Sequence, residues 1–231
     1  MTCDLSALPF DIAAMTAGLR PWVECESSTW EAAAVNRMMD LALRDLFALG
    51  ATLERIPGAG GFGDCVIGRL PHAMRGEPGI LILGHMDTVH PLGTLAALPF
   101  RPESGVCYGP GIADMKAGNY LALEALRQIA RAGLGTPLPV TVMFTSDEEA
   151  GSPSTRALIE AVARRQRIVL VPEPARPDGS IVLGRHAITR YGLTVTGRPT
   201  HAGNTPERGV SAVREMAELL VRAEELSGPE A

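Results

Sequence analysis

The chain has 231 residues, of which 46% are hydrophobic and 20% are charged, so it carries enough apolar material for a sizeable core and is not intrinsically disordered. Its 21 basic and 26 acidic residues give a net charge of −5, which argues against a nucleic-acid partner. No stretch approaches the ~18 consecutive apolar residues of a membrane span and the start carries no cationic leader, so we expect a cytoplasmic protein without a membrane partner.

The first third of the chain predicts one helix and three short strands. Ser28 and Glu31 have the spacing of a capping box, and apolar residues then recur at helical spacing until Gly50. This face of the predicted helix comprises Trp30, Ala34, Met38, Leu41 and Leu46. Strand-like runs follow at residues 51–56, 66–70 and 80–83, separated by glycine and proline. The third run is wholly apolar, as expected of a central strand.

Helices and strands then alternate along the chain. Residues 115–132 and 154–165 have helical periodicity, whereas residues 140–144 and 168–171 are apolar runs typical of buried strands. Such alternation indicates an α/β fold, a three-layer sandwich in which helices flank a mostly parallel central sheet. Ligands in such folds usually bind outside the carboxyl ends of the strands, so the chemistry is expected there.

The pattern changes after Gly184. Residues 187–196 alternate between apolar and polar side chains, and residues 210–226 have helical periodicity. We therefore divide the chain into residues 1–184, the α/β part, and residues 185–231, the opening of a second, small α+β domain. One strand and one helix cannot bury a core of their own, so we expect the chain to stop within this second domain.

Acidic and imidazole side chains follow several of the predicted strands at the point where each strand ends. Because these ends share one edge of the sheet, the side chains should crowd together there. Several carboxylates at one spot repel one another unless a cation neutralises them, and one imidazole with oxygen ligands suits Zn²⁺ or a similar divalent ion. Alone, each group would be an ordinary solvated surface feature; together they predict a metal site. The residues concerned are His85, Asp87, Asp114, Glu148, Glu149 and Glu173.

Spacing within these groups indicates separate roles. His85 and Asp87 are two residues apart and project to the same side of an extended backbone, so Asp87 can accept the ring N–H that His85 does not use for the metal. The adjacent Glu148 and Glu149 project differently. We therefore assign Glu149 as a metal ligand and Glu148 as the general base that holds the attacking water.

Five ordered motifs, GHMDTV, GPGIADMKAG, TSDEEAGS, VPEPA and GRPTHAGNTPERG, resemble the M20 family of zinc peptidases and deacylases, in particular its glutamate carboxypeptidase branch. The resemblance extends from about Trp30 to the last residue. It implies two zinc ions bridged by Asp114. His85 and Glu173 would be the further ligands of one ion, and Glu149 would be a ligand of the other. It also places the family's general base on Glu148 and a cis peptide bond after Asp114.

The resemblance further implies a role for His201, which lies in the motif PTHAG. In the family, a histidine of the lid domain reaches the active site of the partner subunit and stabilises the oxyanion, and the lid commonly forms a homodimer. The remaining histidines, His72, His90 and His186, match no ligand position.

This chain departs from the family pattern in one respect. Family chains continue through the lid and return to the catalytic domain, which supplies a final histidine ligand for the second zinc and residues that bind the substrate carboxylate. All five histidines here lie at or before His201. We therefore expect a truncated chain whose second metal site lacks a ligand unless another polypeptide provides it.

These features predict a zinc-dependent hydrolase that cleaves an amide or peptide bond next to a free carboxylate, in the manner of a glutamate carboxypeptidase. The sequence leaves two alternatives open. One is a deacylase of N-acyl amino acids such as acetylornithine or succinyl-diaminopimelate, because the residues that separate the two substrate classes lie outside this chain. The other is an inactive, truncated remnant.

Overall fold

The computed structural model describes residues 8–184 and 191–226. The chain divides into two compact units, Met1–Ile181 and Val182–Ala231, which we describe separately. Of the strand predicted over residues 187–196, residues 187–190 lie outside the described residues, as does His186, and residues 191–196 do not form a strand.

The first unit contains a five-stranded sheet in the order β1-β2-β6-β3-β7. Strands β6, β3 and β7 pair in parallel, whereas β2 is antiparallel to both of its neighbours, β6 and β1. Four of the five strands therefore run in one direction, which confirms the mostly parallel α/β sheet. The strands are β1 (Thr52–Ile56), β2 (Cys65–Arg69), β3 (Ile80–His85), β6 (Val140–Thr145) and β7 (Ile168–Leu170); β4 (Arg101–Glu103) and β5 (Val106–Tyr108) form a separate hairpin.

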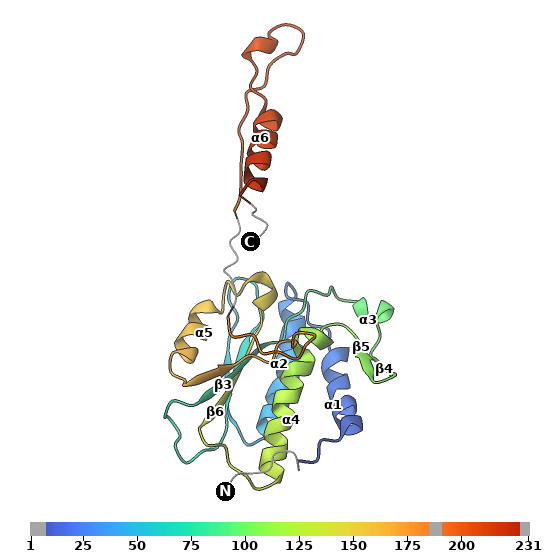
Figure 1. The fold of residues 1–231 in the computed structure, drawn as a ribbon, viewed down its shortest axis with the longest axis vertical. Helices are drawn as coiled ribbons and strands as arrows, with labels where there is room; N and C mark the ends of the chain where they lie inside the picture. Colours follow the sequence, from blue (N-terminus) through green and yellow to red (C-terminus); the bar gives the residue numbers. More distant parts are fainter. Residues whose placement is uncertain (1–7, 185–190, 227–231) are drawn as a thin grey trace. The chain divides into compact units, whose positions relative to one another are not determined.

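Helices cover both faces of the sheet, which gives three layers (Figure 1). The layers follow from the alternation of side chains along each strand. In β6, Val142 and Phe144 join the larger core, while the intervening Met143 packs with Leu81 in a smaller cluster beneath α5. Residues of α1 (Ile12–Glu24), α2 (Ala32–Ala48) and α4 (Ala117–Arg131) fill the larger core, and α5 (Arg156–Ala163) covers the smaller one; α3 is the short helix Thr94–Ala97.

The start of α2 differs from the prediction. Glu31 occupies the N-cap position without a side-chain capping bond, so the predicted capping box is wrong. Ser28 instead forms an isolated bridge with Thr88, because the segment before the helix pairs with the chain beyond β3. Trp30 consequently precedes the helix; its side chain is 72% exposed and packs on Phe62 with ring centroids 5.2 Å apart.

Strand β7 is present but is not buried, contrary to the prediction. Ile168 is 47% exposed and Leu170 is 50% exposed. The reason is its position at the end of the strand order, where within the described part of the chain it pairs only with β3.

The second unit contains helix α6 (Ala212–Glu224), which confirms the helix predicted over residues 210–226. The hydroxyl oxygen of Ser211 caps this helix by accepting a hydrogen bond from the backbone N–H of Arg214. A single antiparallel bridge joins Arg198 to Val210. Among the helices of residues 8–184 and 191–226, none is sufficiently long and apolar to cross a membrane.

Candidate metal centre

The predicted ligands of the first unit come from the ends of three parallel strands and from the turn before α4. His85 is the last residue of β3, Glu148 and Glu149 lie in the 3-10 turn Glu148–Ala150 that follows β6, and Glu173 lies beyond β7. Asp114 lies in the turn Ile112–Lys116 that leads into α4. Because β3, β6 and β7 are parallel, their carboxyl ends meet at one edge of the sheet.

The imidazole of His85 is the centre of this group. Its Nε2 atom lies 2.9 Å from Asp114 Oδ1, 3.5 Å from Glu173 Oε1 and 4.0 Å from Glu148 Oε2. His85, Asp114 and Glu149 each offer one ligand atom within 4.8 Å of the others. One imidazole nitrogen with several carboxylate oxygens is a donor set that suits Zn²⁺, so these residues fit a divalent metal.

Asp87 is fully buried beside this group and positions it. Its carboxylate accepts hydrogen bonds from the Thr29 hydroxyl at 2.9 Å and from the backbone N–H groups of Glu148 and Glu149, each at 3.2 Å. The sequence predicts this carboxylate as the partner of the His85 ring. In the structure His85 Nδ1 lies 3.5 Å from the carboxylate and 2.9 Å from the backbone carbonyl of Asp87, which is the closer acceptor.

The charges at the site perturb its titrating groups. Burial alone lowers the pKa of His85, but the carboxylates of Asp87 and Glu173 outweigh burial and raise the pKa to about 11. Burial raises the pKa of Glu148, and burial together with the Asp114 carboxylate raises the pKa of Glu149. The site therefore gathers more negative charge than its single imidazole can neutralise, as expected of a cation site.

The first turn of helix α4 contacts the backbone of the segments that carry His85 and Glu173. The Asn119 side-chain amide donates a hydrogen bond to the backbone carbonyl of His85 at 2.8 Å. Gly118 lies so close to the backbone carbonyl of Pro172, the residue before Glu173, that a Cβ atom at position 118 would collide with it. The Asp114–Met115 peptide bond is cis, as the resemblance implies.

We expect Gly118→Ala to lower the free energy of unfolding by about 1–3 kcal/mol, because the added methyl forces the Pro172 backbone away from α4. Zinc affinity should fall as well, since that segment carries Glu173. Urea denaturation and zinc titration check both effects. Gly135→Ala is the matched control: no described atom lies within 4 Å of its Cβ position, and it should change stability by no more than about 0.5 kcal/mol. Equal effects of the two variants would contradict the proposed contact.

His201 belongs to the second unit and is not among the residues that the first unit brings together. It is exposed, and its Nδ1 atom accepts a hydrogen bond from the backbone N–H of Gly203 at 3.2 Å. Its assigned role therefore stays a prediction.

Two residues with a part in the site were not predicted. The Thr29 hydroxyl donates a hydrogen bond to Asp87, 58 positions later in the chain, and Asn119, in the first turn of α4, donates one to the His85 backbone carbonyl. Neither carries a local signal in the sequence, because both are ordinary polar residues whose partners are set by tertiary packing.

Comparisons with known proteins agree with this geometry. Residues 81–229 match the sequence model of peptidase family M20/M25/M40. The chain is 37% identical over 206 residues to carboxypeptidase G2 of Pseudomonas sp. (strain RS-16), covering 88% of this chain and 49% of that protein. It is 32% identical over 211 residues to succinyl-diaminopimelate desuccinylase of Dechloromonas aromatica (strain RCB), covering 86% of this chain and 53% of that protein. The chain thus spans about half the length of the curated relatives it matches.

Solved structures show the same fold. The crystal structure of a tripeptidase from Staphylococcus aureus subsp. aureus Mu50 aligns with a TM-score of 0.67 at 18% identity, covering 92% of this chain and 56% of that one. The crystal structure of an aminopeptidase PepT from Bacillus cereus ATCC 10987 aligns with a TM-score of 0.63 at 20% identity, covering 91% and 56%. Since the family model matches most of the sequence, this chain belongs to peptidase family M20/M25/M40.

Proposed function

We propose that this chain carries the metal centre of a zinc-dependent hydrolase that cleaves an amide or peptide bond next to a free carboxylate, in the manner of a glutamate carboxypeptidase. The observation that carries the proposal is the close approach of His85, Asp114 and Glu149, with ligand atoms within 4.8 Å of one another, beside the free carboxylate of Glu148. Membership of the family and the similarity to carboxypeptidase G2 support it.

His85, Asp114 and Glu173 would hold one zinc ion, and Asp114 and Glu149 would contribute to a second, whose final ligand is not among these residues. Asp114 and Glu173 both lie within 3.5 Å of His85 Nε2, which supports their grouping around one ion. Zinc bound in such a site polarises the scissile carbonyl and lowers the pKa of a water molecule.

Glu148 is the proposed general base. Its side chain is 51% exposed, so it is accessible to water and substrate, while its backbone is fixed by Asp87. In this mechanism Glu148 takes the proton from the attacking water and transfers it to the leaving amine nitrogen. His201 of a partner subunit is proposed to stabilise the negative charge that develops on the carbonyl oxygen.

A second candidate function is the deacylation of an N-acyl amino acid. The similarity to succinyl-diaminopimelate desuccinylase favours it, at 32% identity over a similar share of the chain. Both reactions hydrolyse an amide bond and would use the same metal centre. They differ in the amino acid that is released, which is glutamate in the first case and ornithine or diaminopimelate in the second.

A substrate panel tests the proposal. The zinc-loaded protein is assayed with peptides that end in glutamate, with N-acyl glutamates, with N-acetylornithine and with N-succinyl-diaminopimelate, before and after chelation. We expect release of glutamate that falls at least about 100-fold on zinc removal and returns when zinc is added. Preferential cleavage of the last two substrates would favour deacylation. Absence of all hydrolysis by a protein that holds its zinc would count against both candidates as activities of this chain and favour the third alternative, an inactive chain that binds metal.

We also propose that the protein acts in the cytoplasm and that its second unit forms a homodimer contact, with residues 1–184 and 185–231 as catalytic and lid parts. The exposed apolar side chains of α6, Val213, Leu220 and Val221, support the dimer, since an uncovered apolar face indicates a partner. The buried Cys65 thiol, bonded to Ser146, is in keeping with a reducing compartment. Sedimentation velocity over a range of concentrations checks the dimer.

A further inference from the structure

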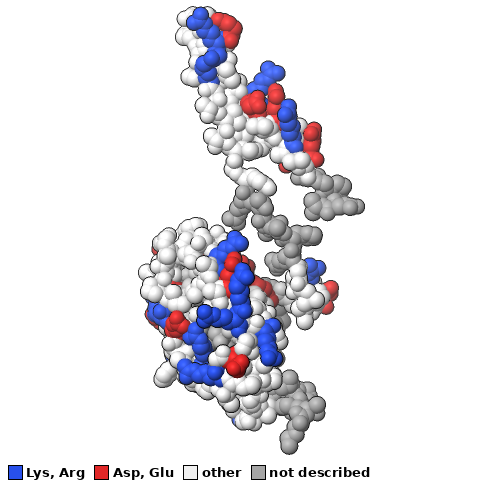
Figure 2. Space-filling model, turned by 90° about the vertical axis from the view of Figure 1, so that its left-hand side faces the viewer, with Lys and Arg blue, Asp and Glu red and all other residues white. Residues whose placement is uncertain are grey.

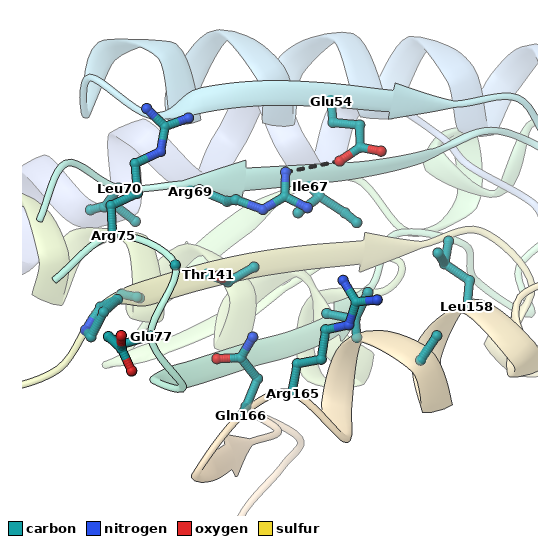
Figure 3. A pocket seen from close by; sticks show the side chains of 15 residues that line it. Glu54, Ile67, Arg69, Leu70, Arg75, Glu77, Thr141, Leu158, Arg165 and Gln166 are labelled. Atoms are coloured by element: carbon teal, nitrogen blue, oxygen red, sulfur yellow. Dashed lines mark hydrogen bonds and ion pairs between the residues drawn. The ribbon is translucent and has the colours of Figure 1, made fainter.

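A second cavity in the first unit, of about 380 Å³, lies between the sheet and the C-terminal end of α5 (Figure 3). We call it the arginine pocket because Arg69, Arg75 and Arg165 line it. Thr141, near the start of β6, also lines it, whereas the metal centre lies beyond the other end of the same strand, where Thr145 pairs with His85. At about 3.3 Å per residue, Thr141 and Thr145 are about 13 Å apart along the strand. The arginine pocket is therefore a separate site.

Positive charge predominates in this pocket. Three guanidinium groups face two carboxylates, those of Glu54 and Glu77. Arg69 is paired with Glu54 at 2.8 Å, but Arg75 and Arg165 form no ion pair within the part of the chain that the structure describes. Arg156 and Arg164, in α5 and at its C-terminal end, differ from Arg165 because both form ion pairs with Glu160.

The arginines are arranged on two sides of the cavity. Figure 3 shows Arg69 on β2 and Arg165 beyond α5, on either side of the strand that carries Thr141. A guanidinium group presents a planar fork of donors that matches a carboxylate with two parallel hydrogen bonds. Arg69 bonds Glu54 through Nη1, so its Nε–Nη2 edge provides one fork, and Arg165 provides the other. Two such forks on either side of the cavity suit a ligand that carries a carboxylate at each end.

The remaining walls are partly apolar. Leu158 and Val162 of α5 line the same cavity; both are partly exposed and pack against the smaller hydrophobic cluster. The volume falls within the range of small-molecule sites, about 300–1,000 Å³. An inorganic ion would leave the apolar wall uncovered, whereas a short hydrocarbon chain between two carboxylates would cover it.

From this arrangement we propose that the arginine pocket binds a small aliphatic dicarboxylate, with its carboxylates on Arg69 and Arg165 and its hydrocarbon chain against Leu158 and Val162. The proposal is independent of the hydrolase activity, because none of these residues belongs to the metal centre.

Isothermal titration of glutarate into the full chain at low ionic strength tests the proposal. We expect saturable binding to one site, weakened at least about tenfold by Arg165→Gln and less by Arg165→Lys, which keeps the charge but loses the fork. The matched control is Arg164→Gln, which removes the same charge one residue away from a side chain that is paired with Glu160 and does not line the pocket. It should leave the affinity within about twofold of the unchanged protein.

Glutarate that binds at the metal centre instead of the arginine pocket would bind equally well to Arg165→Gln and to the unchanged protein. The proposal is overturned if glutarate does not bind the unchanged protein, if Arg165→Gln binds it equally well, or if inorganic phosphate binds as tightly as glutarate. If Arg165→Gln does not unfold cooperatively, Arg69→Gln provides an independent test. Undiminished glutarate affinity in Arg69→Gln would also reject the assignment.

Discussion

Replacement of Glu148 by glutamine should reduce kcat by about 10²–10⁴-fold and leave the zinc content of the protein unchanged. The amide keeps the size of the side chain but cannot accept a proton, and general acid–base groups contribute rate factors of this size. Zinc should stay because the ligand atoms of His85, Asp114 and Glu149 are untouched. Steady-state kinetics with the best substrate of the panel and elemental analysis of the same preparation measure the two quantities.

A matched control for this variant is Glu160→Gln, whose carboxylate lies on the surface of α5, paired with Arg156 and Arg164. It should change kcat by less than about twofold, because surface ion pairs of this kind are worth little and Glu160 does not line the cavity that contains His85, Glu148 and Glu173. Loss of zinc together with activity in Glu148→Gln would instead identify Glu148 as a ligand. Undiminished turnover would remove it from the mechanism.

Replacement of His85 by alanine should lower zinc affinity by more than about 100-fold and abolish hydrolysis with it. His85 is the only imidazole that the described residues bring to the site, and its Nε2 atom is the point on which Asp114 and Glu173 converge. Loss of a residue that merely orients a ligand already reduces metal affinity by about 10–100-fold, so loss of the ligand itself should exceed this. Competition with a fluorescent zinc chelator measures the affinity.

His72→Ala is the comparison for this experiment. The Nε2 atom of His72 lies 3.0 Å from the Thr136 carbonyl oxygen, in a loop contact away from the metal centre. This variant should keep the zinc affinity of the unchanged protein. Stoichiometric zinc in His85→Ala, or an equal loss in both variants, would contradict the assignment of His85 as a ligand.

The convergence of the candidate ligands at one edge of the sheet could largely be predicted from the sequence, because its signals are local. An apolar run predicts a strand, and His85 and Glu148 follow such runs directly or closely. Parallel pairing of β3 with β6 then brings the strand ends together without further information. The internal contacts of the site, such as Thr29 with Asp87, could not be predicted in this way, because they join segments 58 residues apart.

The elements that were missed or misjudged depend on context outside their own sequence. Helix α1 contains Pro21, which argues against a helix when read alone. The hairpin β4–β5 consists of three-residue strands with exposed side chains, too short for a clear alternation. The apolar run of β7 predicts burial, but its residues are exposed. Exposure depends on which elements pack on the strand, and hydrophobic periodicity does not contain that information.

Asp87 has a consequence for how this centre can change over time. One buried carboxylate fixes the backbone of both Glu148 and Glu149, so the proposed proton carrier and the proposed ligand share a single anchor. Mutational drift at position 148 should remove turnover alone, whereas drift at position 87 should disturb proton transfer and ion retention at the same time. Descendants that keep an ion but have lost their chemistry are therefore expected to retain Asp87 and to vary at Glu148.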